Sequence, residues 1–70
     1  MQINPGTLVF QTQYGSMGLV IADNTMIWSY SDGSMYVVTY DDNTPTTFQD
    51  LGGFAKYHVS RGIWKIVYRA

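Results

Sequence analysis

Few side chains of this sequence have the spacing that catalysis requires. His58 and Ser60 are two positions apart, so on a strand they would share a face, but no acidic residue lies near enough in sequence to orient the imidazole. Three of the five aspartates stand in predicted turns, where a carboxylate bonds to its own backbone. The chain has no cysteine, and Asp41, Asp42 and His58 match no known metal-ligand spacing. We therefore expect no catalytic residue, no metal site, no cofactor and no enzymatic activity.

The cationic residues are more informative, because they are separated from the acidic residues along the chain. All five aspartates lie at or before Asp50, whereas the four Lys and Arg residues follow it. Arg61, Lys65 and Arg69 share strand parity and would line one exposed stripe on a final strand. Such a stripe suits an anion: a phosphate, a nucleic acid or an acidic protein surface. The alternative is that these cations pair with aspartates of the same chain, or keep an edge strand soluble.

The elements that must position these side chains are predicted to be strands. Glutamate is absent and leucine and alanine are scarce, while β-branched and aromatic residues are frequent. Seven glycines, with many Asn and Asp residues, divide the chain at short intervals. With 70 residues, 46% hydrophobic residues and a net charge of −1, the chain is too apolar for disorder and too short for two cores. We expect a single all-β domain spanning residues 1–70.

Two turn signals predict three consecutive strands. Asp32 with Gly33 is a strong signal for a two-residue hairpin turn, and Asp23 with Asn24 is a weaker one. Two-residue turns at both places put one set of residues on the inner face: Met17, Leu19, Ile21, Met26, Trp28, Tyr30, Met35 and Val37. The opposite face then carries Gly18, Val20, Ala22, Ile27, Ser29, Tyr36, Val38 and Tyr40.

The remaining segments are predicted from their turn residues and alternation. Residues 7–12 are expected to form a first strand, and residues 63–69 a final one with Trp64, Ile66 and Tyr68 inward. The polar segment 41–47 is expected to be a loop. Residues 48–54 are expected to form one turn of α- or 3₁₀-helix ended by the glycine pair, whereas the pattern of residues 54–60 favours neither strand nor helix.

Five or six short strands in a chain of this length usually close into a small barrel, because closure removes exposed edges. The spacing resembles the SH3-like small barrels, including the KOW type. The segments that carry the resemblance are residues 5–9, 15–21, 28–33 and 48–54. The resemblance implies the fold, a small barrel with a short helical turn before the last strand, and no particular activity. In style the chain also resembles small bacteriophage accessory proteins.

A second apolar face is the feature that points to a binding function. Ile27, Tyr36, Val38 and Tyr40 would lie together on the face opposite the predicted core, and Tyr14 is expected to be exposed in a loop. Tyrosines beside aliphatic residues are typical of the centres of protein interfaces. The alternative is that this face packs inside a strongly curved barrel.

These observations favour a non-enzymatic protein-binding module whose partner is a host protein or a second copy of the chain. The setting we expect is a bacteriophage accessory protein that modulates a host protein. A small-barrel binder of nucleic acid or nucleotides, using Arg61, Lys65 and Arg69 on phosphates, is the alternative. No apolar run of transmembrane length and no signal peptide is evident, so we expect a cytoplasmic protein without membrane contact.

Overall fold

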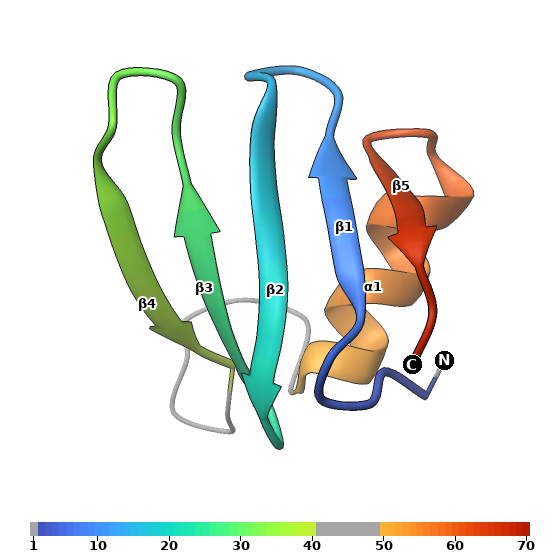
Figure 1. Cartoon of the computed structure of the whole chain (residues 1–70). Helices are drawn as coiled ribbons and strands as arrows, with labels where there is room; N and C mark the ends of the chain where they lie inside the picture. The colour runs from blue at the N-terminus through green and yellow to red at the C-terminus, as the bar shows by residue number, and fades with distance from the viewer. Residues whose placement is uncertain (1, 41–49) are drawn as a thin grey trace.

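The computed structural model describes residues 2–40 and 50–70, which form one antiparallel sheet and one helix (Figure 1). The elements in chain order are β1 (Leu8–Gln11), β2 (Ser16–Ala22), β3 (Thr25–Ser29), β4 (Met35–Thr39), α1 (Leu51–Ser60) and β5 (Trp64–Tyr68). The strand order across the sheet is β4-β3-β2-β1-β5. The predicted all-β class with five short antiparallel strands is confirmed.

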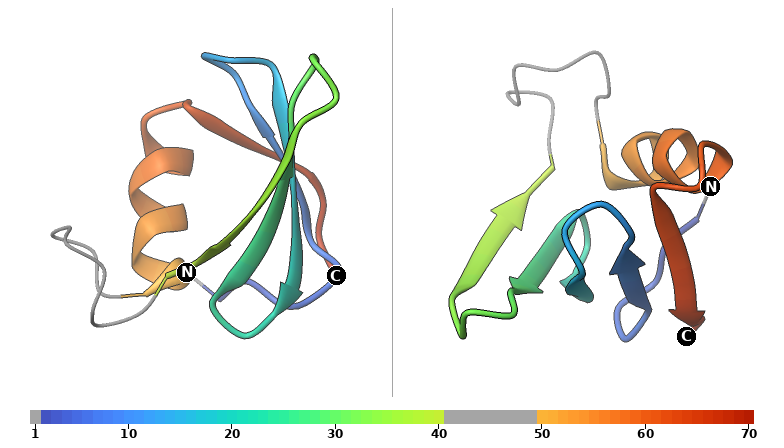
Figure 2. Two further views of the ribbon diagram at one scale, coloured as in Figure 1. Left: turned by 90° about the vertical axis from the view of Figure 1, so that its left-hand side faces the viewer. Right: turned by 90° about the horizontal axis from the view of Figure 1, so that it is seen from above.

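The chain reaches this order by a meander followed by a return. Strands β1 to β4 pair consecutively, and after α1 the chain comes back so that β5 pairs with β1. Helix α1 lies against one face of the sheet, and the sheet curves around that side, as the two views of Figure 2 show. We call this the helix side and the opposite face the outer face. The relation to SH3-like barrels stays a prediction, because a strand order alone does not establish kinship.

The turn at Asp23 and Asn24 joins β2 to β3 as the sequence predicts. Ala22 pairs with Thr25, so the turn has two residues, and Asn24 has a φ of 60°. The register nevertheless shifts by one residue between Val20 and Ala22, where the ladder between β2 and β3 has a bulge or a similar irregularity. Val20 therefore lies opposite Met26, and the predicted pairing of Ile21 with Met26 is wrong.

The turn between β3 and β4 is one residue longer than predicted. The backbone N–H of Tyr30 donates to Ser34 O at 2.9 Å, which leaves residues 31–33 as the loop, and Gly33 has a φ of 90°. Asp32 Oδ1 accepts hydrogen bonds from the Ser34 hydroxyl at 2.6 Å and from the Ser34 N–H at 2.9 Å, and these bonds lower the pKa of Asp32. Trp28 consequently pairs with Tyr36, and its predicted pairing with Val37 is wrong.

Both shifts exchange the predicted faces of β2 and β4 but leave β3 as expected. Met26 and Trp28 point to the helix side and are buried, as predicted. On β2, however, it is Gly18 and Val20 that face inward with them, so the predicted core positions of Met17, Leu19 and Ile21 are wrong. The buried core consists of Val9, Val20, Met26, Trp28, Tyr40, Leu51, Ala55 and Trp64.

Helix α1 is longer than the single turn that the sequence predicts. It begins after Asp50, whose side chain accepts from Gly53 N–H at 2.8 Å, so the glycine pair lies inside the first turn instead of ending the helix. Leu51 and Ala55 are buried against the sheet. The helix ends at Ser60, and Gly62 follows with a φ of 72°. Residues 54–60, for which the pattern was ambiguous, are thus helical, whereas the predicted loop 41–47 and residues 48–49 lie outside the described residues.

Candidate functional site

The residues predicted to bind a partner do not form one surface. Ile27 pairs with Leu19 and Val37 and points to the outer face. Tyr36 and Val38 point to the helix side, because they lie opposite Trp28 and Met26. Their predicted common patch with Ile27 is therefore wrong, since the one-residue shift at the β3–β4 loop turns β4 over. The tyrosines and Val38 instead belong to the surroundings of a pocket.

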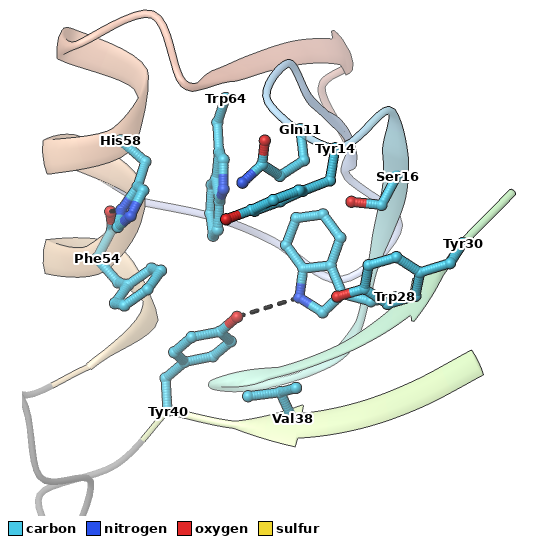
Figure 3. Close-up of a pocket in the computed structure, with 10 residues that line it drawn as sticks. All are labelled: Gln11, Tyr14, Ser16, Trp28, Tyr30, Val38, Tyr40, Phe54, His58 and Trp64. Carbon is cyan, nitrogen blue, oxygen red and sulfur yellow. Dashed lines mark hydrogen bonds between the residues drawn. The ribbon is translucent and has the colours of Figure 1, made fainter. Parts of the chain in front are cut away.

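This pocket lies on the helix side of the sheet, between α1 and the ends of the β1–β2 and β3–β4 hairpins (Figure 3). Its volume is about 220 Å³. Its lining consists mainly of aromatic rings and contains no Asp, Glu, Lys or Arg among the described residues. The lining residues are Gln11, Tyr14, Ser16, Trp28, Tyr30, Val38, Tyr40, Phe54, His58 and Trp64.

The rings that form the floor of the pocket contact one another across three elements. The centroids of Trp28 on β3 and Trp64 on β5 are 5.3 Å apart. Phe54 on α1 lies 4.8 Å from Tyr40 and 5.4 Å from Trp64, centroid to centroid. Tilted contacts at these distances are favourable aromatic pairs, so the floor is a packed unit. The sequence placed Trp28 and Trp64 in the core, but it missed Phe54, because the predicted helical turn ended at this residue whereas α1 continues to Ser60.

His58 belongs to this ring cluster and not to a catalytic pair. Its ring stacks on Phe54 with a centroid distance of 4.1 Å, and its Nδ1 donates to the carbonyl oxygen of Phe54 at 2.7 Å. Ser60 Oγ donates to Tyr57 O at 2.8 Å. Because residues two apart on a helix do not face each other, His58 and Ser60 do not share the face that a strand would have given them.

Tyr40 and Trp28 form the buried polar contact of the pocket floor. The indole Nε1 of Trp28 donates to the hydroxyl oxygen of Tyr40 at 3.1 Å, and Tyr40 is 7% exposed. Burial raises the pKa of the Tyr40 phenol above its ordinary value of 10.0, and the hydrogen bond from Trp28 opposes this shift in part.

The raised pKa of Tyr40 predicts a loss of stability at alkaline pH. Below pH 10 the phenol is protonated in both the folded and the unfolded chain, so its contribution is fully present. Above pH 10 the unfolded chain releases this proton first, and the free energy of unfolding falls until the folded phenol also ionises. Urea unfolding between pH 8 and pH 11 should show a steeper decline than in Tyr40→Phe. Equal slopes in the two proteins would contradict the prediction.

Two polar side chains of the β1–β2 hairpin and one exposed ring close the pocket on its other side. Ser16 is 1% exposed, and its Oγ has no hydrogen-bond partner among residues 2–40 and 50–70. In Figure 3 this oxygen points toward the rings of Tyr14 and Trp28. Gln11 Oε1 accepts from Gln13 N–H, which turns its amide nitrogen toward the pocket (Figure 3). A buried hydroxyl without a partner lowers the stability of the fold, whereas the amide nitrogen of Gln11 is placed to donate a hydrogen bond to a ligand in the pocket (Figure 3).

The three cations do not form the predicted stripe. Only Lys65 lies in β5, where it pairs with Phe10 and is exposed. Arg61 caps the C-terminus of α1, with its guanidinium 4.3 Å from the centre of the Tyr57 ring, and Arg69 follows the end of β5. Arg61 and Arg69 lie outside β5, so the alternation of side chains along this strand does not align them with Lys65.

The outer face of the sheet is apolar, and no helix or strand of the described residues covers it (Figure 2). Leu19, Ile21, Met35 and Val37 are exposed there, and Ile27 is half-buried between them. The sequence predicted one apolar face beyond the core. That face exists, but of the four residues predicted to form an apolar patch on it, Ile27, Tyr36, Val38 and Tyr40, it carries Ile27 alone.

Among the described residues, no group of three or more His or Asp side chains is placed to hold a metal ion. None of their helices is long and apolar enough to span a membrane. Comparison of the chain with protein-family models, with curated proteins and with solved structures found no match.

Proposed function

We propose that this protein is a non-enzymatic protein-binding module whose pocket receives an aromatic side chain of the partner. The observation that carries the proposal is the ring-lined pocket with the amide nitrogen of Gln11 turned toward it (Figure 3). Aromatic side chains seated in desolvated pockets dominate the energetics of many protein interfaces. A bacteriophage accessory protein that occupies a host protein's surface is the setting that we include in this proposal.

The size and polarity of the pocket favour one uncharged ring. Its volume of about 220 Å³ is below the range of roughly 300–1,000 Å³ that is typical of pockets for whole small molecules. Its described lining offers no carboxylate, ammonium or guanidinium group, so a charged ligand group would lose much of its hydration with little compensation. The amide group of Gln11, which is turned toward the pocket (Figure 3), favours a ring with a polar atom, which means a tyrosine or a tryptophan over a phenylalanine.

Exposed tyrosines at the rim provide the contacts that a partner needs beyond this one ring. Tyr14 is 71% exposed on the β1–β2 hairpin, and Tyr36 packs edge-on against Tyr30 with centroids 5.5 Å apart. Tyrosine is enriched in interfaces because it offers a large apolar area and a polar tip. Tyr14 and Tyr30 line the pocket, and Tyr36 extends the aromatic surface beside Tyr30.

The alternative of a nucleic-acid binder is less well supported by the same geometry. A base can stack on the pocket rings, but phosphates then need cations at the pocket margin. Arg61, Lys65 and Arg69 lie instead at the end of α1, on the outer face and after β5. None of the three lines the pocket.

Selection from a displayed library of random peptides tests the proposal. We expect the enriched peptides to share one tyrosine or tryptophan at a fixed position, and fluorescence anisotropy of a labelled peptide then gives the affinity. Tyr14→Ala should weaken this affinity about tenfold, the loss of one aromatic contact. Tyr68→Ala is the matched control, because Tyr68 is also exposed, at 62%, but does not line the pocket.

Two outcomes of this experiment contradict the proposal. Enriched peptides without a common aromatic residue would exclude the pocket as the recognition site, as would equal losses in the two tyrosine variants. A labelled single-stranded oligonucleotide is tested in parallel. If it binds with salt-sensitive affinity and competes with the peptides, the nucleic-acid alternative replaces the proposal.

A further inference from the structure

The two edge strands of the sheet differ in how they are protected. An edge strand exposes unpaired backbone groups, and proteins usually protect it with charges, proline or a bulge. β5 contains Lys65 and is followed directly by Arg69. β4 has the sequence Met-Tyr-Val-Val-Thr, with neither charge nor proline, and its ladder to β3 has no irregularity. Its residues Met35, Tyr36 and Val37 are 60%, 57% and 63% exposed.

The hydrogen bonds at the two ends of β4 establish which of its backbone groups face outward. Tyr40 N–H donates to Asn24 O at 2.7 Å, and Ser34 O accepts from Tyr30 N–H at 2.9 Å, so both residues point to β3. Alternate residues of a strand direct their N–H and C=O groups to opposite sides. Tyr36 therefore also points to β3, whereas Met35 and Val37 point away from the sheet, toward the edge.

We propose that this edge pairs with β4 of a second copy of the chain, antiparallel and with the two-fold axis at Tyr36. Met35 of each copy then lies opposite Val37 of the other, and their outward N–H and C=O groups exchange about four hydrogen bonds. The two Tyr36 rings meet across the axis on the helix side. Aromatic pairs and apolar pairs of this kind stabilise antiparallel strands.

Pairing of β4 with β4 of a second copy is more favourable than pairing of β4 with β5 of a second copy. Pairing of β4 with itself closes after two copies, whereas pairing of β4 with β5 of another copy would continue into a filament. Lys65 opposes the second arrangement, because its charge would lie next to the apolar residues of β4. Because β4 contains no charged residue, self-pairing brings no charge next to an apolar side chain of the strand. The contact is small, so we expect a weak dimer with a dissociation constant on the order of 100 µM.

This inference is independent of the proposed function. The pocket lies on the helix side between α1 and the hairpin ends, and pairing through β4 leaves its described lining in place. The dimer would add the second Tyr36 ring beside the existing pair of Tyr30 and Tyr36. Failure of one proposal therefore leaves the other standing.

Cysteine crosslinking tests the register directly, because the chain has no cysteine of its own. Cα atoms opposite each other in a non-hydrogen-bonded antiparallel pair are about 4.5 Å apart, which is within the range for a disulfide. Tyr36→Cys should give a disulfide-linked dimer under mild oxidation. Val67→Cys, at an exposed position of the other edge strand, is the control and should crosslink at least tenfold more slowly. Equal crosslinking rates would overturn the proposal.

A proline substitution tests the hydrogen bonds of the edge. Val37→Pro removes an N–H that points away from β3, so the sheet should stay folded. The mass by light scattering should approach twice 7.9 kDa for the natural chain at about 1 mM and stay at 7.9 kDa for this variant. Val37→Lys should have the same effect if the proline variant fails to fold. A natural chain that stays monomeric at 1 mM, or a folded variant that still dimerises, would overturn the proposal.

Discussion

Replacing Trp28 by alanine is expected to remove about 3–5 kcal/mol of the free energy of unfolding. The side chain is 5% exposed, its ring contacts Trp64, and its indole N–H donates to Tyr40. Truncation of a buried tryptophan costs about 3–5 kcal/mol of unfolding free energy. A 70-residue domain has a total of only about 4–10 kcal/mol, so the loss takes a large share of it.

Urea unfolding followed by circular dichroism measures this effect. Trp28→Phe keeps a ring against Trp64 but removes the donor to Tyr40, so it should cost about 1–2 kcal/mol. Tyr36→Ala is the control, because Tyr36 lies opposite Trp28 on β4 but is mostly exposed. If Trp28→Ala unfolded at the same urea concentration as Tyr36→Ala, the packing described for Trp28 would be wrong.

The sequence predicts the number and direction of the strands better than it predicts their faces. The number and direction of the strands follow from short segments rich in β-branched and aromatic residues, which Gly, Asn and Asp separate. The face of β2 was not predictable, because Leu19 and Val20 are both apolar and alternation carries no information between them. The register shift after Val20 determines which side chains of β2 face the helix. No residue type at this position indicates such a shift.

The full extent of the helix was missed for a related reason, since only one turn, over residues 48–54, was predicted. A glycine pair normally ends a helix, and Gly52 and Gly53 have low helix propensity. Tertiary contacts outweigh this propensity: Asp50 caps the first turn, Leu51 N–H donates to Asn24 Oδ1 at 3.2 Å, and Leu51 is buried. Asp50 could have indicated the helix start, because aspartate is a preferred N-cap residue whose side chain accepts a hydrogen bond from the backbone N–H three residues later.

The pocket could be predicted only in its parts. The high content of Trp and Tyr indicated an aromatic core, and three of the residues proposed for partner binding, Tyr14, Val38 and Tyr40, do line the pocket. Their arrangement depends on Phe54 and His58, which α1 brings from the other side. Contacts between segments this far apart in sequence follow from the topology and not from local pattern.

Replacing Gly18 by alanine is expected to destabilise the fold by about 1–3 kcal/mol, although the change is a single methyl group. Gly18 lies opposite Trp28 in the sheet and has no room for a side chain. A Cβ atom there would come within 2.6 Å of Met26 Cε and within 2.8 Å of two ring carbons of Trp28. The end of the methionine can move, but the indole is held by Trp64 and Tyr40.

A double-mutant cycle separates this steric effect from a general cost of alanine in β2. Trp28→Phe removes the part of the indole that Gly18→Ala would strike, so in that background the substitution should cost at least about 1 kcal/mol less. Urea unfolding of the four proteins gives the coupling energy. Additive effects within about 0.5 kcal/mol would show that the ring of Trp28 does not lie over Gly18. The packing described for the pocket floor would then be wrong, because the same indole ring contacts Trp64 and donates to Tyr40.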